Sequence, residues 1–303
     1  MLIGIAIGDA YGAPFENLSY KDAGEKLKSD GFVSGRYTDD TQQALAIAEL
    51  LVSGDEITPF SLAESFLSAY NRDKRSGYSR VTRAMLASPD PESFLVSMSE
   101  QERENRKTDG AAMRAPPLGF LPERIKVIEA AKLSASITHG HPDAIAATVA
   151  VSLIAHERYY RATPYCLIWD CIRDEIEQIN PDIISYCDTC ARLKTPDREI
   201  ILGEHAGYGV PYTESKIFLG AVIFLLASYG DDPHRLLIES ILLGGDTDTV
   251  AAVVLGAALI RGAEENNVWS LIPDLEDGPF GKEYLMMTGD QLTARYPSGL
   301  SIS

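Results

Sequence analysis

Apolar residues recur every three or four positions along most of the chain, which is the spacing that places them on one face of an α-helix. No series of alternating polar and apolar residues with hairpin turns, the signature of a β-sheet, accompanies them. The pattern predicts helices over residues 40–54, 61–73, 124–139, 143–162, 214–230, 232–244 and 248–265.

Small residues mark two segments as candidates for the centre of a helical bundle. Gly4, Gly8 and Gly12 recur every four residues, so a helix there has one bare face for close packing. Ala and Gly also interrupt the Val and Leu surface of the predicted helix 248–265. We expect that helix at the centre, with an Asp-rich N-terminus that points carboxylates into a shared cleft.

Breaks between the predicted helices fall at clusters of Pro and Gly, such as 88–93, 115–123 and 272–281. None is long or polar enough for a linker, and no repeat or low-complexity tract is present. The sequence therefore predicts an all-α fold, a compact multi-helix bundle in which residues 1–303 form a single domain.

Composition narrows the function classes. The chain has 303 residues, of which 45% are hydrophobic and 23% charged, and its net charge of -17 disfavours binding to nucleic acid or to an anionic membrane. No signal peptide and no apolar run long enough to span a bilayer is evident, so we expect a cytoplasmic protein.

Four cysteines fall in one short window, at Cys166, Cys171, Cys187 and Cys190. Reduced thiols are expected in a cytoplasmic chain. A zinc site with C-x4-C and C-x2-C arms is the alternative, although the arms lack the usual Gly and turn residues.

Two aspartates, Asp246 and Asp248, lie two residues apart beside Gly244 and Gly245. At about 5 Å and an effective dielectric near 20, their repulsion is roughly 3 kcal/mol. Helix N-termini, basic side chains or bound cations are the candidates to offset this repulsion.

A second acidic stretch, 37–45, crowds Thr38, Asp39 and Asp40 onto the start of a predicted helix. Local capping explains part of this pattern, because Asp39 with Gln42, or Asp40 with Gln43, has the spacing of a capping box. The same alternative applies to the later aspartate pair.

Two such stretches offer more oxygen atoms than two caps require. Hard divalent cations bind several oxygen ligands, and two ions about 3.5–4 Å apart can share bridging carboxylates. Neither stretch contains His or Cys, which favours two Mg²⁺ or Mn²⁺ ions over zinc.

Three further stretches carry weaker signals. Glu16 lies either in a surface loop or at the rim of the acidic cleft. Gly110 and Ala111 leave backbone N–H groups of a helix start open, as in phosphate cradles. His139 and His141 precede a helix, where a histidine is a cap, a surface residue or a donor to a phosphate or ribose hydroxyl.

Together these stretches form a recognisable set. G-x-x-x-G-D-A-x-G-x-P-x-E, T-D-D-T-Q, G-A-A-M-R, T-H-x-H-P and G-G-D-T-D-T-V-A-A follow one another through most of the chain. In kind and order they resemble the motifs of the ADP-ribosylglycohydrolase family, which includes dinitrogenase-reductase-activating glycohydrolase and the ADP-ribosylhydrolases.

The resemblance implies a compact all-α fold with a binuclear Mg²⁺ or Mn²⁺ centre. It implies metal ligands at Thr38, Asp39, Asp40, Asp246, Asp248 and Thr249. It implies catalytic roles for Glu16, Asp39, Asp40 and Asp248. It implies substrate contacts with the diphosphate and its surroundings at Asp109, Gly110, Ala111, Ala112, Met113 and His139, and near the adenine at Tyr212.

One departure bears on substrate binding. Relatives usually carry Asn where this chain has Asp109. An anion beside a diphosphate is unfavourable unless it faces a metal or a cation such as Arg114.

These features predict a metal-dependent hydrolase that cleaves the glycosidic bond between ADP-ribose and a modified side chain or small acceptor. Its partners would be ADP-ribosylated substrates and ADP-ribose. A non-catalytic ADP-ribose-binding or crystallin-like protein is one alternative. A haloacid-dehalogenase-type phosphatase is another, because D-x-D-x-V after an apolar run mimics its nucleophile motif; that motif requires a preceding β-strand.

Overall fold

Helices form nearly all the regular structure in the computed structural model, which describes residues 1–33, 35–261 and 267–299. The α-helices are α1 (Leu2–Gly12), α2 (Tyr20–Asp30), α3 (Asp39–Ser53), α4 (Pro59–Arg72), α5 (Arg80–Leu86), α6 (Pro91–Val96), α7 (Glu100–Glu104), α8 (Arg124–Ser136), α9 (Pro142–Arg161), α10 (Tyr165–Ile179), α11 (Ile184–Arg192), α12 (Arg198–Leu202), α13 (Ser215–Tyr229), α14 (Pro233–Leu243), α15 (Thr247–Ala258) and α16 (Lys282–Arg295). Short 3-10 helices are η1 (Ala13–Phe15), η2 (Asp109–Ala111), η3 (Pro116–Phe120), η4 (Pro181–Ile183), η5 (Gly203–His205) and η6 (Asn267–Asp274).

The predicted all-α class is confirmed, because no β-strand occurs within the described residues. Each of the seven segments with helical periodicity forms a helix, with ends that differ by at most three residues for the first six. The seventh, α15, ends at Ala258, and positions 262–265 of the predicted helix lie outside the described residues. The element before Asp246 is helix α14, which ends at Leu243. The phosphatase interpretation requires a strand there and is therefore wrong.

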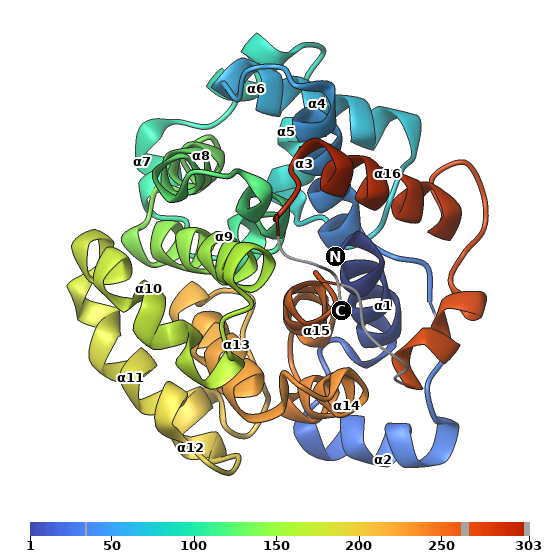
Figure 1. The fold of residues 1–303 in the computed structure, drawn as a ribbon, viewed down its shortest axis with the longest axis vertical. Coiled ribbons are helices and arrows are strands. Elements are labelled where there is room, and N and C mark those ends of the chain that lie inside the picture. The colour runs from blue at the N-terminus through green and yellow to red at the C-terminus, as the bar shows by residue number, and fades with distance from the viewer. Residues whose placement is uncertain (34, 262–266, 300–303) are drawn as a thin grey trace.

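Helices α1 and α15 lie side by side at the centre of the bundle (Figure 1). Their backbones touch, since a Cβ atom at Gly8 would lie 2.2 Å from the carbonyl carbon of Ala251. A Cβ atom at Gly4 would lie 2.5 Å from the carbonyl oxygen of Leu255. The glycine repeat is therefore the reason that two helices from opposite ends of the chain pack so closely.

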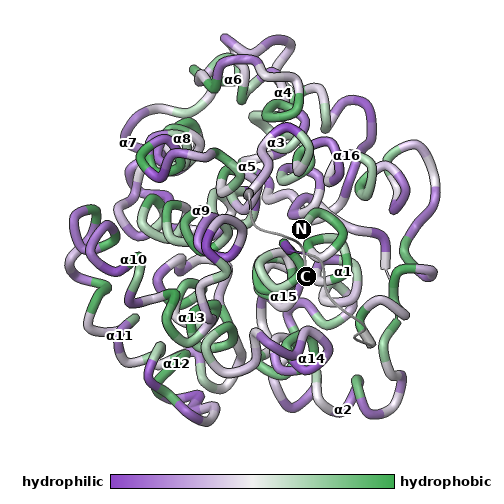
Figure 2. The backbone as a smooth tube through the Cα atoms, viewed as in Figure 1, coloured by the Kyte–Doolittle hydropathy of each residue, from purple (hydrophilic) through white to green (hydrophobic). Residues whose placement is uncertain are grey.

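The remaining helices surround this pair. Helix α15 contacts α3, α9, α13 and α14, and its residues are buried throughout. In Figure 2 the central helices are largely hydrophobic, whereas the outer helix α2 carries many hydrophilic residues. None of the described helices has the length and apolar character needed to cross a membrane.

Replacing Gly8 with alanine is expected to lower the free energy of unfolding by about 3 kcal/mol or more, because the new methyl group overlaps the α15 backbone. Gly289→Ala is the matched control, since a Cβ there meets nothing within 4 Å inside helix α16. That change should raise stability by about 0.5–1 kcal/mol. Urea denaturation measures both, and equal effects of the two substitutions would contradict the close contact.

Candidate metal and ligand site

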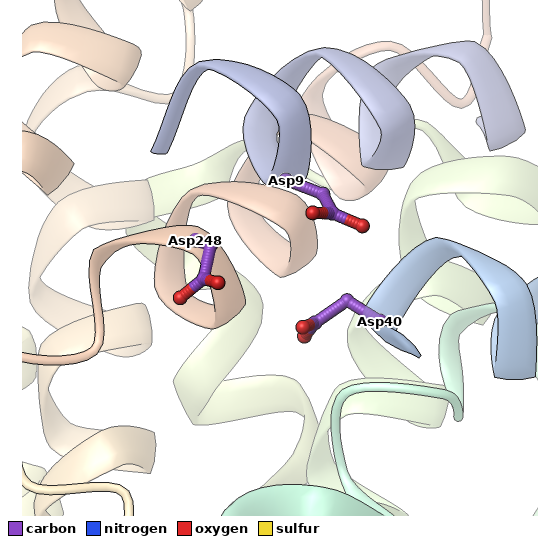
Figure 3. Close-up of side chains that lie close together, drawn as sticks. All are labelled: Asp9, Asp40 and Asp248. Atoms are coloured by element: carbon purple, nitrogen blue, oxygen red, sulfur yellow. The ribbon is translucent and has the colours of Figure 1, made fainter. Parts of the chain in front are cut away.

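The contact between α1 and α15 brings Asp9 and Asp248 together. A Cβ atom at Gly12 would lie 2.6 Å from the Cα atom of Asp248, so the first turn of α15 rests against the end of α1. Asp9, one turn earlier on α1, points toward the same space, as Figure 3 shows. Two acidic residues far apart in sequence thus lie on adjoining helix surfaces.

Asp9 also holds the start of α3. Its carboxylate accepts hydrogen bonds from the backbone N–H groups of Thr38 (2.8 and 2.9 Å) and Thr41 (3.0 Å). It accepts two more from the hydroxyl groups of Thr38 (2.9 Å) and Thr41 (2.6 Å). These bonds satisfy N–H groups that the first turn of a helix leaves unpaired.

The local capping interpretation is wrong for the first acidic stretch, whereas in the second the Oδ1 atom of Asp248 accepts a hydrogen bond from the N–H of Thr249 at 3.1 Å. Thr38 is the N-cap residue of α3 and Asp246 that of α15, and neither side chain makes a capping hydrogen bond. Because Asp9 caps α3 from another helix, Asp39 and Asp40 are not needed for this role.

Asp40 joins Asp9 and Asp248 in a compact acidic cluster. Each of the three offers a carboxylate oxygen within 4.8 Å of the others, from α3, α1 and α15 (Figure 3). All three are buried, and Oδ1 of Asp40 has no hydrogen-bond partner. A buried carboxylate oxygen without a partner is costly, and a bound cation would satisfy it.

A second acidic group extends this cluster toward the η2 turn. Asp246 follows Gly244 and Gly245, both with positive φ, and its N–H donates to the carbonyl oxygen of Val210 at 2.8 Å. A Cβ atom at Gly245 would lie 2.2 Å from that oxygen, so this sharp turn requires glycine. Its geometry aims Asp246 at Asp109, and the two side chains lie within hydrogen-bond reach.

Electrostatics favours a cation at this place. Burial raises the pKa of Asp39, Asp40, Asp246 and Asp248 well above the usual range, and neighbouring carboxylates raise it further. Burial likewise raises the pKa of Asp109 to about 8. Oxygen donors, tight spacing and unpartnered oxygens together fit hard divalent ions.

Most of the predicted site residues line one cleft of about 660 Å³. Those that line it are Glu16, Asp39, Asp40, Asp109, Gly110, Met113, His139, Tyr212, Asp246, Asp248 and Thr249. Three predicted residues do not line it: Thr38, Ala111 and Ala112. The Thr38 hydroxyl donates to Asp9, and both alanines are fully buried in the core. Glu16 and Tyr212 are the exposed members and stand at its rim.

The η2 turn presents only part of its backbone to the cleft. The N–H groups of Ala112 and Met113 donate to the carbonyl oxygen of Asp109, at 2.7 and 3.1 Å. They are therefore used inside the turn, and Gly110 is the part that faces the cleft. The open N–H groups expected from the sequence are those of Gly110 and Ala111, and their binding to a phosphate stays a prediction.

His139 stands against this turn in a fixed orientation. Its Nε2 lies 2.7 Å from the hydroxyl oxygen of Thr108, and its Nδ1 lies 2.8 Å from that of Thr138. Burial lowers the pKa of His139 well below its usual range, so the ring is neutral at physiological pH. His141 instead caps α9, accepting from the N–H of Asp143.

Arg80, Arg106 and Arg114 line the cleft, and of these the sequence analysis named only Arg114 as a candidate cation. Arg114 is buried and donates to Gln43, to Thr138 and to the carbonyl oxygen of Ser134, each at 2.7 Å. Arg106 is half-buried and donates to the hydroxyl of Thr82 at 3.3 Å. Within the described part of the chain, neither forms an ion pair.

Asp9 is the other residue that sequence analysis did not assign to the site. The sequence did contain an indication, because Asp9 is a single charge inside an otherwise apolar helix. A buried carboxylate requires partners, so such a charge points to a polar site. The cysteines, in contrast, form no metal site. Cys166 and Cys171 are exposed, Cys187 and Cys190 are buried, and no metal-binding group among the described residues includes them.

Comparison with known proteins agrees with this architecture. The profile of the ADP-ribosylglycohydrolase family matches residues 1–264. ADP-ribosylhydrolase ARH3 of Xenopus tropicalis is 28% identical, over 86% of this chain and 85% of its own length. An uncharacterized protein of Archaeoglobus fulgidus is also 28% identical, over 87% of this chain and 86% of its own length.

Comparison of structures shows the same fold. A solved structure described as an ADP-ribosylglycohydrolase-related protein complex superimposes with a TM-score of 0.64. It covers 99% of this chain and 96% of its own, at 21% sequence identity. The all-α bundle is thus a fold already seen in solved proteins. With the family profile spanning most of its length, this chain belongs to the ADP-ribosylglycohydrolase family.

Proposed function

We propose that this protein hydrolyses the glycosidic bond between ADP-ribose and a modified side chain or small acceptor, with a pair of divalent ions. The observation that carries the proposal is one cleft with two kinds of lining. Five buried aspartates line it, and so do Arg106 and the Gly110 turn. ADP-ribose has matching parts: ribose hydroxyl groups that bind metal ions, and a diphosphate that binds cations and backbone N–H groups.

In this proposal Asp39, Asp40, Asp246, Asp248 and Thr249 hold two Mg²⁺ or Mn²⁺ ions. The Thr38 side chain bonds Asp9 and contributes by fixing the α3 turn. Bound divalent ions polarise oxygen atoms of the substrate and lower the pKa of a water molecule. Asp9 keeps α3 and α15 in register so that the ligands from both helices face one another.

The remaining residues bind and orient the substrate. Glu16, at the rim on the metal side, supplies a carboxylate that accepts a proton from water or returns one to the leaving group. Neutral His139 braces the Gly110 turn without adding charge. Tyr212, more than half exposed, offers a ring surface at the outer end of the cleft for the adenine base.

We also propose that the chain acts as one domain, because α16 packs on α1 and α3. Its place of action is the cytoplasm, a prediction from the sequence alone. ADP-ribosylated substrates and ADP-ribose are the partners, which agrees with the name of the ARH3 relatives, ADP-ribosylhydrolase.

Arg106 gives a test of the diphosphate end. Replacing Arg106 with leucine is expected to weaken ADP-ribose binding about 10- to 100-fold, the usual value of a charge-assisted hydrogen bond. Arg83→Leu is the matched control, because Arg83 is an exposed residue of α5 outside the cleft. Isothermal calorimetry measures both dissociation constants, and equal affinities would remove Arg106 from the ligand site.

A non-catalytic binder is separated from an enzyme by pairing two measurements. Calorimetry with ADP-ribose and Mg²⁺ reports binding, and release of ADP-ribose from arginine- and serine-linked peptides reports turnover. The proposal expects both. Binding without any product from either peptide would favour the ADP-ribose-binding or crystallin-like alternative.

A further inference from the structure

Asp109 differs from the other cleft residues because it is an acid at the edge of the proposed ligand set. Its side chain is 4% exposed, and its Oδ2 atom has no hydrogen-bond partner. The carboxyl groups of Asp40 and Asp248 act on it electrostatically, and the carboxyl group of Asp246 lies within hydrogen-bond reach. Asp109 therefore faces the acidic residues of the cleft.

The alternative partner for this carboxylate is Arg114, and the structure excludes it. The Arg114 guanidinium donates to Gln43, Thr138 and the Ser134 carbonyl, and lies over the ring of Phe66. The ion pairs of the described residues include none with Asp109. In its ionised form, a buried carboxylate beside other carboxylates, with no basic partner, is stabilised by a cation from outside the chain.

The backbone around Asp109 holds the side chain in this position. Its N–H donates to the carbonyl oxygen of Tyr212 at 3.2 Å. The carbonyl oxygen of the preceding Thr108 accepts from the Ser215 hydroxyl at 2.8 Å, which ties the turn to the start of α13. A ligand carried by a braced turn loses little conformational entropy when it binds an ion.

We propose that Asp109 is an additional ligand of the metal centre, supplying a carboxylate oxygen to the divalent ion on the Asp246 side. This inference rests on the proposed pair of ions and extends its ligand set to the η2 turn. Mg²⁺ and Mn²⁺ both accept six oxygen ligands, so a further carboxylate can replace a water molecule there. The extra negative charge strengthens the affinity for that one ion.

Asp109→Asn tests the inference, because asparagine keeps the size of the side chain and removes its charge. The probe is Mn²⁺ alone, added to metal-free protein and followed by calorimetry and by the electron paramagnetic resonance signal of free Mn²⁺. We expect wild type to bind two ions, and the variant to bind one of them at least tenfold more weakly. Asp174→Asn, at an exposed carboxylate of α10, is the control and should bind as wild type does.

The possible outcomes separate the two proposals. Two ions bound to the folded Asp109→Asn variant with wild-type affinities would overturn the role of Asp109 and leave the metal pair intact. Wild-type protein that binds no Mn²⁺ would overturn both. Circular dichroism confirms that the variant is folded, and Asp109→Ala, which also removes the carboxylate, should weaken the same ion.

Discussion

Replacing Asp248 with asparagine is expected to abolish hydrolysis and, in the absence of metal, to make the protein more stable. Asp248 lies in the cluster with Asp9 and Asp40, so its loss removes an oxygen ligand that no neighbour replaces. We expect a fall in kcat/KM of about 10³-fold or more, roughly 4 kcal/mol of transition-state stabilisation.

The gain in stability has the same physical origin. In metal-free protein the Asp248 carboxylate is buried against Asp246, Asp9 and Glu16, which all repel it. Asparagine keeps the acceptor for the N–H of Thr249 and removes the charge, so the free energy of unfolding should rise by about 1–3 kcal/mol. For an ordinary buried polar residue, a substitution that destroys activity would not increase stability.

Both effects are measured on one purified variant, by peptide hydrolysis and by urea denaturation in EDTA. Asp174→Asn serves again as control and should change neither quantity. An Asp248→Asn enzyme as fast as wild type would contradict the metal mechanism. A variant that is less stable than wild type in EDTA would contradict the repulsion.

Mg²⁺ or Mn²⁺ is expected to reverse the pH dependence of stability. The pKa of Asp109 is raised to about 8, and those of Asp40, Asp246 and Asp248 lie well above the usual range. In the unfolded chain these carboxyls lose their protons near the ordinary value of 3.8, whereas the folded metal-free protein holds them to higher pH. Their contribution to stability is therefore full below about pH 4 and is lost as the pH rises toward about 8.

The metal-free protein should lose at least about 2 kcal/mol of stability between about pH 5.5 and pH 8, because each carboxyl still protonated contributes about 1.4 kcal/mol per pH unit. Ordinary carboxyls are already ionised over this interval and do not contribute. Divalent ions bind the deprotonated form, so saturating metal should make the protein more stable at the higher pH. At a hundredfold excess over Kd, each ion adds about 2.7 kcal/mol.

Thermal and urea unfolding at the two pH values, with EDTA or with Mn²⁺, measure this effect. A buffer without divalent ions, brought to equal ionic strength with Na⁺, controls for general screening of the charges. If stability in EDTA rises between the two pH values, or if Mn²⁺ leaves the trend unchanged, the buried carboxyls do not behave as a cation site.

Much of the fold follows from local sequence pattern. The 3.6-residue periodicity located seven helices, and the Gly4–Gly8–Gly12 repeat identified the face on which α1 meets α15. Helix α2 was missed because only Ala23 is buried within it, and α16 because its buried residues are Leu285, Thr288 and Leu292. Such narrow apolar stripes give a weak periodic signal.

The site was predictable as a set of residue types but not as a geometry. The two acidic stretches led to Asp39, Asp40, Asp246 and Asp248 because carboxylates this close need a partner. Their patterns also fitted local caps, and for the first stretch only the tertiary contact from Asp9 shows that Asp39 and Asp40 are not needed as caps. A contact between residues 29 positions apart leaves no trace in local spacing.

The place of Arg106 in the cleft was missed for a related reason. Arg106 is a common residue in unremarkable local sequence, and its position in the lining of the cleft becomes evident only from the fold. The direction of Asp109 was equally open from sequence, which allowed either a metal or Arg114 as its partner. The hydrogen bonds of Arg114 to Gln43, Thr138 and the Ser134 carbonyl oxygen argue against Arg114 as that partner.

Hydrolysis of ADP-ribosylated arginine and serine peptides by enzyme stripped with EDTA, with Mg²⁺ or Mn²⁺ then added back, tests the central claim most directly. The proposed binding of two ions by Asp40, Asp246, Asp248 and their neighbours predicts no ADP-ribose release after stripping, and recovery once two ions per chain are restored. Release of ADP-ribose at an undiminished rate in EDTA would contradict it.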